Sequence, residues 1–258
     1  MIYEEFGKQN GKVIILLHGG GLSWWNYREA AELLQNDFRI IIPILDGHAK
    51  SDHDFTTIEE NAARIIDFID ENFAGKILMI GGLSLGAQIL LEILSLRKNI
   101  CQYAIVESAL VIPSKLTHSF IKPAISSCYS LIRHRWFSKL QFQALHIQKT
   151  LFDEYYRDSC GITKDNLIAF LRANSLYQLK ENLSNCNAIV SIYVGSKENH
   201  AMHKSAKQIH EKLNRSSLTV LPQLHHGEFS INHANAYVKA IYALINQKQI
   251  LSDLHLID

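Results

Sequence analysis

The sequence of 258 residues has little of what marks secreted, membrane-spanning or disulfide-rich proteins. Its four cysteines, Cys101, Cys128, Cys160 and Cys186, are scattered and form no Cys-x-x-Cys pair, so we expect reduced thiols. No apolar run reaches the length of about 18 residues that a membrane-spanning helix needs. The segment 1–6 has no basic stretch followed by an apolar one. We therefore expect no signal peptide and predict a cytoplasmic location.

An excess of charge of one sign is also missing. The chain has 26 basic and 25 acidic residues and a formal net charge of +1, which gives no reason to expect nucleic acid or an anionic membrane as a partner. The small basic cluster 133–135 is more typical of a solvated helix face than of an anion site. Hydrophobic residues make up 47% of the chain, enough for a large core in one α/β domain. We expect a small-molecule substrate as the partner, and the sequence leaves a homodimer open.

Short apolar and β-branched runs alternate with helical patterns along most of the chain. Six of these runs predict strands, at residues 13–17, 39–42, 77–80, 103–106, 189–194 and 218–221. Most are apolar throughout, which is typical of strands covered on both faces. Between two of them, Thr57 and Glu60 form a capping box that opens an amphipathic helix. The alternation predicts a mostly parallel β-sheet flanked by helices.

The alternation breaks between residues 113 and 187. This stretch has helical patterns, many aromatic residues and no convincing strand, and no Gly/Ser linker separates it from the rest. We therefore predict one catalytic α/β core, residues 1–112 and 188–258, with a helical lid (cap) insertion at 113–187. The aromatic residues of the lid favour a substrate with an apolar acyl or ring-bearing group.

A Gly-x-Ser-x-Gly sequence at residues 82–86 stands between an apolar strand and a helical pattern. In such a tight strand-to-helix turn the hydroxyl of Ser84 is exposed, and the two glycines leave space where a Cβ would collide. Leu85 would offer its backbone N–H at the helix N-terminus, where developing negative charge is stabilised. The motif predicts that Ser84 is a nucleophile. The alternative is an ordinary glycine-rich turn.

Three successive glycines and His18 follow the predicted strand 13–17. Such a loop lets the backbone approach a ligand and turn its N–H groups inward, and in a serine hydrolase it would supply the second oxyanion donor. A phosphate loop is improbable, because no Gly-Lys-Ser/Thr follows, and a flexible turn is the other alternative. Trp24 and Trp25 lie close by and suit either a pocket wall or the core. The predicted binding residues of this loop are Gly20, as the first choice of donor, with Gly19, Gly21 and Trp24.

A nucleophilic serine needs a histidine and an orienting carboxylate. His226 precedes a glycine in the loop after the predicted strand 218–221, at the end of the sheet where α/β proteins keep their chemistry. Its neighbour His225 is expected to pack or hydrogen-bond locally. Glu198 follows the predicted strand 189–194 and would hold the imidazole of His226 in one tautomer. Glu107, after the strand 103–106, is a rival acid. An adjacent histidine pair also suits a metal site, but the other histidine cluster, His200 and His203, has no carboxylate at ligand spacing, and we expect no metal.

Together these residues resemble the α/β-hydrolase superfamily, in particular its lidded esterase-like and carbon–carbon-bond hydrolase-like branches. The order Ser84, Glu198, His226 follows the Ser–acid–His order of that superfamily. The segment 46–51 is similar to its Asp-x-x-Gly-x-Ser loop, with Ala49 where relatives usually have glycine, and Glu198 stands where most relatives have aspartate. The resemblance implies hydrolysis without a metal or an organic cofactor.

The sequence therefore predicts a carboxylesterase-like serine hydrolase with a Ser-Glu-His triad and a backbone oxyanion hole. It would act on an ester or related acyl bond of a small, partly apolar substrate. The alternative is a ligand-binding or signalling protein of the same fold with slow or no turnover, because the fold alone does not fix the reaction.

Overall fold

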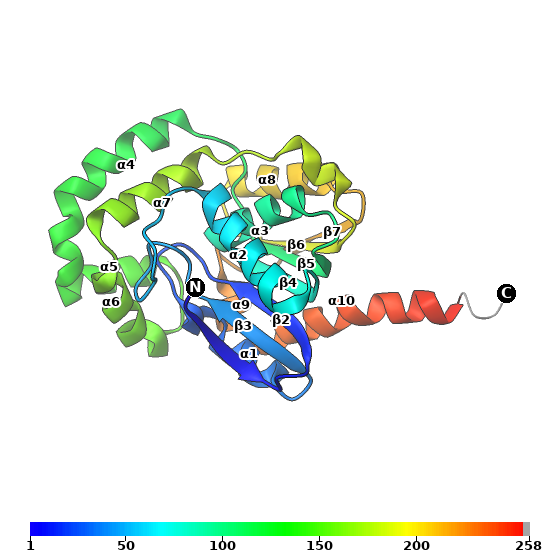
Figure 1. Ribbon diagram of the computed structural model, residues 1–258. Helices are drawn as coiled ribbons and strands as arrows, with labels where there is room; N and C mark the ends of the chain where they lie inside the picture. The colour runs from blue at the N-terminus through cyan, green and yellow to red at the C-terminus, as the bar shows by residue number, and fades with distance from the viewer. Residues whose placement is uncertain (255–258) are drawn as a thin grey trace.

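A seven-stranded sheet forms the centre of the computed structural model, which describes residues 1–254 of the chain (Figure 1). The strand order is β1-β3-β2-β4-β5-β6-β7, in which β1 is antiparallel to β3 and the remaining neighbours are parallel. The strands are β1 (Tyr3–Gly7), β2 (Lys12–Leu17), β3 (Phe38–Pro43), β4 (Ile77–Leu83), β5 (Cys101–Glu107), β6 (Ile189–Gly195) and β7 (Ser216–Leu221). The predicted α/β class with a mostly parallel sheet is confirmed.

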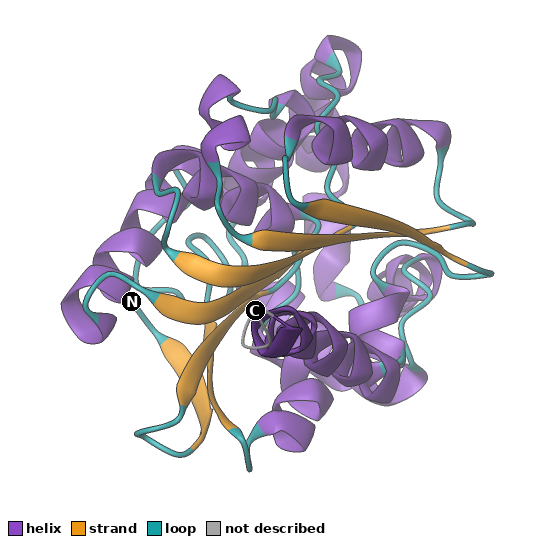
Figure 2. Cartoon of the chain, turned by 90° about the vertical axis from the view of Figure 1, so that its right-hand side faces the viewer, coloured by secondary structure: helices purple, strands orange, loops and turns teal. Residues whose placement is uncertain are grey.

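Helices cover both faces of the twisted sheet (Figure 2). One core cluster contains residues of α2, α3 and α8, and the other contains residues of α1, α9 and α10. The bounds of these helices are α1 (Arg28–Leu34), α2 (Ile58–Phe73), α3 (Leu85–Leu96), α8 (His200–Lys212), α9 (Glu228–Asn232) and α10 (Ala234–Leu254), and the 3-10 helix η1 (Trp24–Tyr27) precedes α1. No helix within residues 1–254 combines the length and the apolar character needed to cross a membrane.

The continuously apolar strands supply both cores at once. Along β2, Ile15 and Leu17 pack into the cluster under α2 and α3, whereas Ile14 and Leu16 pack into the cluster under α1 and α10. Successive side chains of a strand point to opposite faces, so a strand buried on both sides has no polar face. The continuously apolar sequence of these strands therefore reflects the burial of both faces of the sheet.

Helix α2 begins where the capping box predicts. Thr57 accepts a hydrogen bond from the backbone N–H of Glu60 (N···Oγ1 3.0 Å), and Ile58, Ile65 and Ile69 are buried on one stripe. All six predicted strands are present. Strand β1 was not predicted, because this edge strand has no buried residue and its sequence, Tyr3–Gly7, has no strong apolar alternation.

The stretch between β5 and β6 is helical, as the break in alternation predicts. It contains α4 (Lys115–Cys128), α5 (Arg135–Ala144), α6 (Phe152–Gly161) and α7 (Lys164–Leu176), together with the 3-10 helices η2 (Tyr129–Arg133), η3 (Lys149–Leu151) and η4 (Glu181–Asn185). In Figure 1 the helices α4 to α7 lie on the side of the molecule away from the end of α10. The division into core and lid stays a prediction, and residues 255–258 of the predicted core lie outside the described residues.

Candidate active site

Ser84 stands in the turn that joins β4 to α3. Its backbone is held at φ 53° and ψ −112°, and its N–H donates to the backbone oxygen of Glu107 (2.9 Å). A Cβ at Gly82 would lie 2.6 Å from the backbone oxygen of Gly86, and a Cβ at Gly86 would lie 2.1 Å from that of Leu17. A larger residue at Gly82 would push the start of α3 away from β4, and a larger residue at Gly86 would push it away from β2. The two glycines thus permit the close packing that presents the Ser84 side chain.

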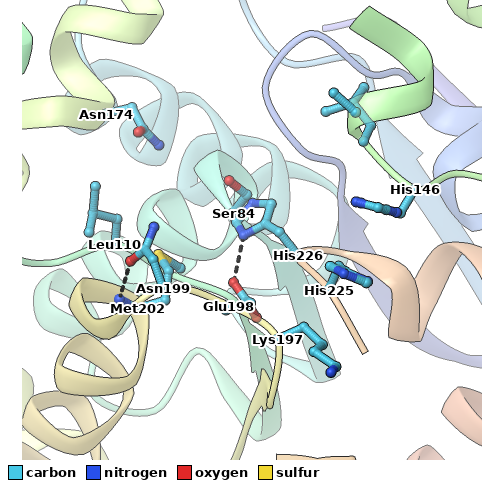
Figure 3. Close-up of a pocket in the computed structure, with 12 residues that line it drawn as sticks. Ser84, Leu110, His146, Asn174, Lys197, Glu198, Asn199, Met202, His225 and His226 are labelled. Atoms are coloured by element: carbon cyan, nitrogen blue, oxygen red, sulfur yellow. Dashed lines mark hydrogen bonds and ion pairs between the residues drawn. The ribbon is translucent and has the colours of Figure 1, made fainter. Parts of the chain in front are cut away.

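Glu198 and His226 meet above the ends of β6 and β7. The Nδ1 atom of His226 lies 2.8 Å from Glu198 Oε2 (Figure 3). The other oxygen, Oε1, accepts hydrogen bonds from the Ser108 hydroxyl (2.7 Å) and the Gly195 backbone N–H (2.8 Å). Burial acts to raise the pKa of Glu198, but the hydrogen bond and charge of His226, together with these two donors, outweigh it and lower the pKa. The carboxylate is therefore held ionised beside the imidazole.

Two cavities open onto Ser84 and His226. The wider one has a volume of about 500 Å³ and a mixed lining, in which Glu198, Asn174 and Lys197 stand beside aliphatic side chains and Met202 (Figure 3). The smaller and more enclosed one has a volume of about 130 Å³. Apart from Ser84 and His226, its lining is made of glycines and aliphatic side chains: Gly19, Gly20, Leu22, Leu83, Leu145, Ile147, Gly227 and Ile231. Ser84 and His226 thus stand where a small apolar space meets a larger space of mixed lining.

The glycine loop after β2 reaches the smaller cavity with one amide available. The N–H of Gly19 donates to Asn26 Oδ1 (3.1 Å), and the N–H of Gly21 donates to His48 Nε2 (3.0 Å). For the N–H of Gly20 the structure shows no hydrogen-bond partner within residues 1–254. A Cβ at Gly20 would lie 3.5 Å from Leu85, whose own N–H begins α3 and has no acceptor within the helix. Gly20 therefore packs against the side chain of Leu85, the residue that follows Ser84.

Two buried histidines hold this loop against its neighbour. His48 accepts from Gly21, and His18 accepts from the backbone N–H of Leu45 (3.1 Å). Burial lowers the pKa of His48 to about 4, and burial together with the nearby His48 lowers the pKa of His18 to about 3. Both rings are therefore neutral at neutral pH and act as hydrogen-bond acceptors. They belong to the segments 18–21 and 46–51 that the sequence singled out, but sequence reasoning gave them no such role.

Glu107, the rival acid, occupies a different environment. Its side chain is buried, its Oε1 accepts from the Ser230 backbone N–H (3.3 Å), and no hydrogen bond joins it to His226 among the described residues. Burial raises the pKa of Glu107 to about 7. Glu198 is therefore the carboxylate that contacts the imidazole of His226. Glu107 instead contacts the backbone of Ser230, which lies further along the chain.

Trp24 and Trp25 are not brought to the cavities that contain Ser84. Trp24 packs near Phe6, and the guanidinium of Arg28 lies over its ring at 4.6 Å from the centroid. Trp25 is buried and donates its Nε1–H to Asp158 of α6 (2.9 Å). Trp25 therefore connects the core to the helical insertion, and neither indole is placed to touch a molecule at Ser84.

The segment between α5 and η3 closes over the site, which sequence reasoning missed. Leu145 lines both cavities, and the ring of His146 stacks on that of His225 at a centroid separation of 3.8 Å. His225 is itself held by Glu228 (Nδ1···Oε2 2.9 Å), in line with the expected local contact. No spacing in the sequence signals this contact, because His146 and His225 come from segments far apart in the chain. Within residues 1–254 no group of three or more potential ligands is placed to hold a metal ion.

Known proteins share the fold of this chain. The model of a family described as the alpha/beta hydrolase family matches residues 14–240. No curated protein sequence matches the chain significantly. Among solved structures, the chain is similar to the enol-lactonase from Burkholderia xenovorans LB400, with a TM-score of 0.80, 13% identity and coverage of 95% of this chain and 96% of that one. It is also similar to a thermophilic esterase from Thermogutta terrifontis (TM-score 0.77, 16% identity, 95% and 93% covered) and to MenH from S. aureus (0.76, 15%, 96% and 98%). At these identities the likeness shows the fold alone.

Proposed function

This chain belongs to the alpha/beta hydrolase family, and from that premise we propose that it is a serine hydrolase with Ser84, Glu198 and His226 as its triad. The bond cleaved would be an ester or related acyl bond of a small, partly apolar substrate. The observation that carries the proposal is the 2.8 Å contact between His226 Nδ1 and the buried Glu198, beside a cavity that Ser84 shares. With Nδ1 engaged by the carboxylate, Nε2 is the nitrogen that accepts a proton.

In the proposed reaction the Ser84 oxygen attacks the acyl carbon while its proton passes to His226 Nε2. The bond to the leaving group then breaks, and His226 returns the proton to the departing oxygen. A water molecule next gives a proton to His226 and attacks the acyl carbon of the acyl-enzyme. The bond from that carbon to the Ser84 oxygen then breaks, His226 returns the proton to this oxygen, and the acid is released. Glu198 stays ionised throughout and stabilises the imidazolium.

The oxyanion of each tetrahedral intermediate would be bound by the backbone N–H groups of Leu85 and Gly20. Leu85 begins α3, where the helix dipole favours negative charge. The contact between these two residues and the absence of a partner for the Gly20 N–H within residues 1–254 support this pairing. Gly19 and Gly21 would hold the loop through Asn26 and His48 and leave the donation to Gly20.

The smaller cavity is the proposed acyl site. Its 130 Å³ and aliphatic lining resemble an engineered cavity of about 150 Å³ that binds a single benzene molecule. An acyl group of a short chain or of one ring fits such a space. The leaving group would then occupy the wider cavity, whose mixed lining can hold a larger alcohol and hydrogen-bond to its polar groups.

Labelling with a small fluorophosphonate tests the nucleophile. The wild-type protein should be labelled at Ser84 only, and Ser84→Ala should abolish labelling and lower kcat for p-nitrophenyl butyrate by on the order of 10⁶. Ser127→Ala, an exposed serine on α4, is the matched control and should behave as wild type. Labelling that persists in Ser84→Ala would refute the assignment. A single burst of product without further turnover would instead favour a ligand-binding protein that keeps the pocket.

A further inference from the structure

The stretch 108–152 contains no aspartate or glutamate. It contains six basic residues, all exposed: Lys115, Lys122, Arg133, Arg135, Lys139 and Lys149. The rest of the chain therefore has an excess of acidic residues, and the net charge of +1 conceals a strong asymmetry. Such an asymmetry is typical of proteins that bind an anionic partner through one region.

Most of these cations have no carboxylate to neutralise them. Arg135 pairs with Asp153, whereas the other five form no ion pair with any residue in the described part of the chain. The electrostatic field of an unpaired cation is not cancelled by a neighbouring carboxylate, and at moderate salt it extends about 10 Å into solvent. The surface formed by this stretch is therefore electropositive.

Helix α4 exposes apolar side chains on the face that points away from the molecule. Ile121 and Ile125 are half-buried on its inner face. Leu116 and Phe120, which are 71% and 63% exposed, lie four residues apart on the opposite face.

Helix α5 repeats this arrangement. Ser138 and Phe142 are buried on its inner side, whereas Trp136 and Leu140, 60% and 57% exposed, lie four residues apart on the outer side. Lys139 stands beside them and is exposed. Figure 1 shows α4 and α5 on the same side of the molecule, away from the end of α10. Each of the two helices thus exposes an apolar pair and also carries exposed cations.

We propose that this outer surface of α4 and α5, defined by Leu116, Phe120, Trp136 and Leu140 with the flanking cations and called here the basic-apolar face, docks on an anionic lipid bilayer. Lysine and arginine would contact lipid phosphates, while the leucine, phenylalanine and tryptophan side chains would enter the boundary between headgroups and acyl chains. Tryptophan in particular is enriched at that boundary, because its ring is apolar and its N–H is polar.

Other occupants fit this face less well. A second copy of the chain would bring an equally electropositive surface against it, and like charges would repel. A nucleic acid would use the cations and could stack on the aromatic rings, but Leu116 and Leu140 offer it neither a charge nor a π-face. A bilayer surface uses the cations and the aliphatic side chains together.

Co-sedimentation with vesicles tests the proposal without any measurement of turnover, so its outcome is independent of the proposed hydrolase activity. The wild-type protein should sediment with vesicles of equal parts phosphatidylglycerol and phosphatidylcholine. It should stay in solution with phosphatidylcholine alone and should be released by added salt. Both Phe120→Ser/Trp136→Ser and Lys122→Glu/Lys139→Glu should reduce the bound fraction at least about tenfold. Leu96→Ser/Lys98→Glu changes an exposed leucine and an exposed lysine near the end of α3, and this control should bind as wild type.

Tryptophan fluorescence adds a readout of insertion at one residue. Trp25 is buried and Trp24 is packed under Arg28, so a blue shift with anionic vesicles should come from Trp136. Trp136→Phe should lose the shift and still sediment, because phenylalanine retains the apolar contact. Thermal unfolding checks that each variant is folded.

Three outcomes would overturn the proposal. The first is that wild type fails to sediment with anionic vesicles. The second is that the control variant loses binding as much as the two face variants. The third is that wild type is a dimer in analytical ultracentrifugation and the face variants are monomers, which would make the face an interface between copies.

Discussion

The carboxyl group of Glu107 accepts a hydrogen bond from the backbone N–H of Ser230, four residues beyond His226 (Oε1···N 3.3 Å). The backbone oxygen of the same Glu107 accepts from the N–H of Ser84 (2.9 Å). One residue at the end of β5 is therefore bonded both to the nucleophile turn and to the helix that follows the proposed base. The second carboxyl oxygen, Oε2, is buried and has no hydrogen-bond partner among the described residues.

This burial predicts that Glu107 contributes less to stability as the pH rises toward neutral. The pKa of Glu107 is raised from 4.5 to about 7, so between these values the folded state binds a proton that the unfolded state has released. Stability from this group is complete below about pH 4.5, declines as the pH rises to about 7 and is constant above that. Glu107→Gln keeps the acceptor for Ser230 and cannot ionise. Relative to wild type it should gain on the order of 3 kcal/mol of unfolding free energy between about pH 4.5 and about pH 8.

Urea unfolding of both proteins at about pH 5 and about pH 8 measures this change. A difference between the two proteins that is the same at both pH values would show that Glu107 does not titrate in this range.

Replacing each of the two candidate acids by glutamine should give unequal losses of activity. Glu198→Gln should lower kcat by roughly 10⁴, because the imidazole of His226 loses the charge that stabilises it and the acceptor that fixes its tautomer. Glu107→Gln should keep most of the activity, because Glu107 contacts Ser230 and not the imidazole. Steady-state kinetics with p-nitrophenyl butyrate, at a pH at which both variants are folded, measures the two rates. A larger loss of activity in Glu107→Gln would show that Glu107, and not Glu198, is the acid of the triad.

Because His18 and His48 are buried and neutral, we expect the free energy of unfolding to fall in acid. The pKa of His48 is lowered to about 4, so between this value and about 6.5 the unfolded state binds more protons than the folded state, and stability falls as the pH falls. His48→Gln keeps an acceptor for Gly21 and does not titrate. The unfolding free energy of this variant should therefore fall less than that of wild type from about pH 7 to about pH 5. His200→Gln, an exposed position at the start of α8, is the control and should follow wild type.

The volume of the smaller cavity predicts a limit on acyl length. Butyryl and benzoyl esters should be good substrates, whereas octanoyl and decanoyl esters should have a kcat/KM lower by at least about tenfold, because their chains exceed the enclosed space. Ile147→Ala enlarges that space and should shift the preference toward longer acyl groups. Leu140→Ala, on the outer side of α5, should not. Equal kcat/KM for butyrate and octanoate in wild type would exclude this cavity as the acyl site.

The parts of this fold that are local in sequence could be predicted. Six strands, the capping box at Thr57 and the strand-turn-helix around Ser84 each depend on neighbouring residues, so their pattern is visible in the chain. Strand β1 could not be predicted in this way, because it forms through backbone pairing with β3 at the edge of the sheet and buries no apolar face. Its existence depends on a partner more than on its own sequence.

Not all of the residues that line the candidate site could be predicted from the sequence. Glu198 and His226 follow strands, so their positions at one end of the sheet could be expected, whereas the contact of Leu145 with both cavities could not. Packing between distant segments decides such contacts. Trp24 shows the reverse case, because its nearness in sequence to the glycine loop suggested a pocket residue and its packing beside Phe6 and Arg28 places it elsewhere.

The order of the strands along the chain decides when the candidate site can form. Ser84 follows β4 in the middle of the sheet, but its proposed partners follow β6 and β7, which are synthesised only after the whole helical insertion. Pairings between segments so far apart form late, because the loop between them must first be closed. As the chain leaves the ribosome, the turn around Ser84 is complete long before His226 has been synthesised. If Ser84, Glu198 and His226 act together as proposed, a nascent or truncated chain that ends before β7 would carry Ser84 as an unactivated alcohol.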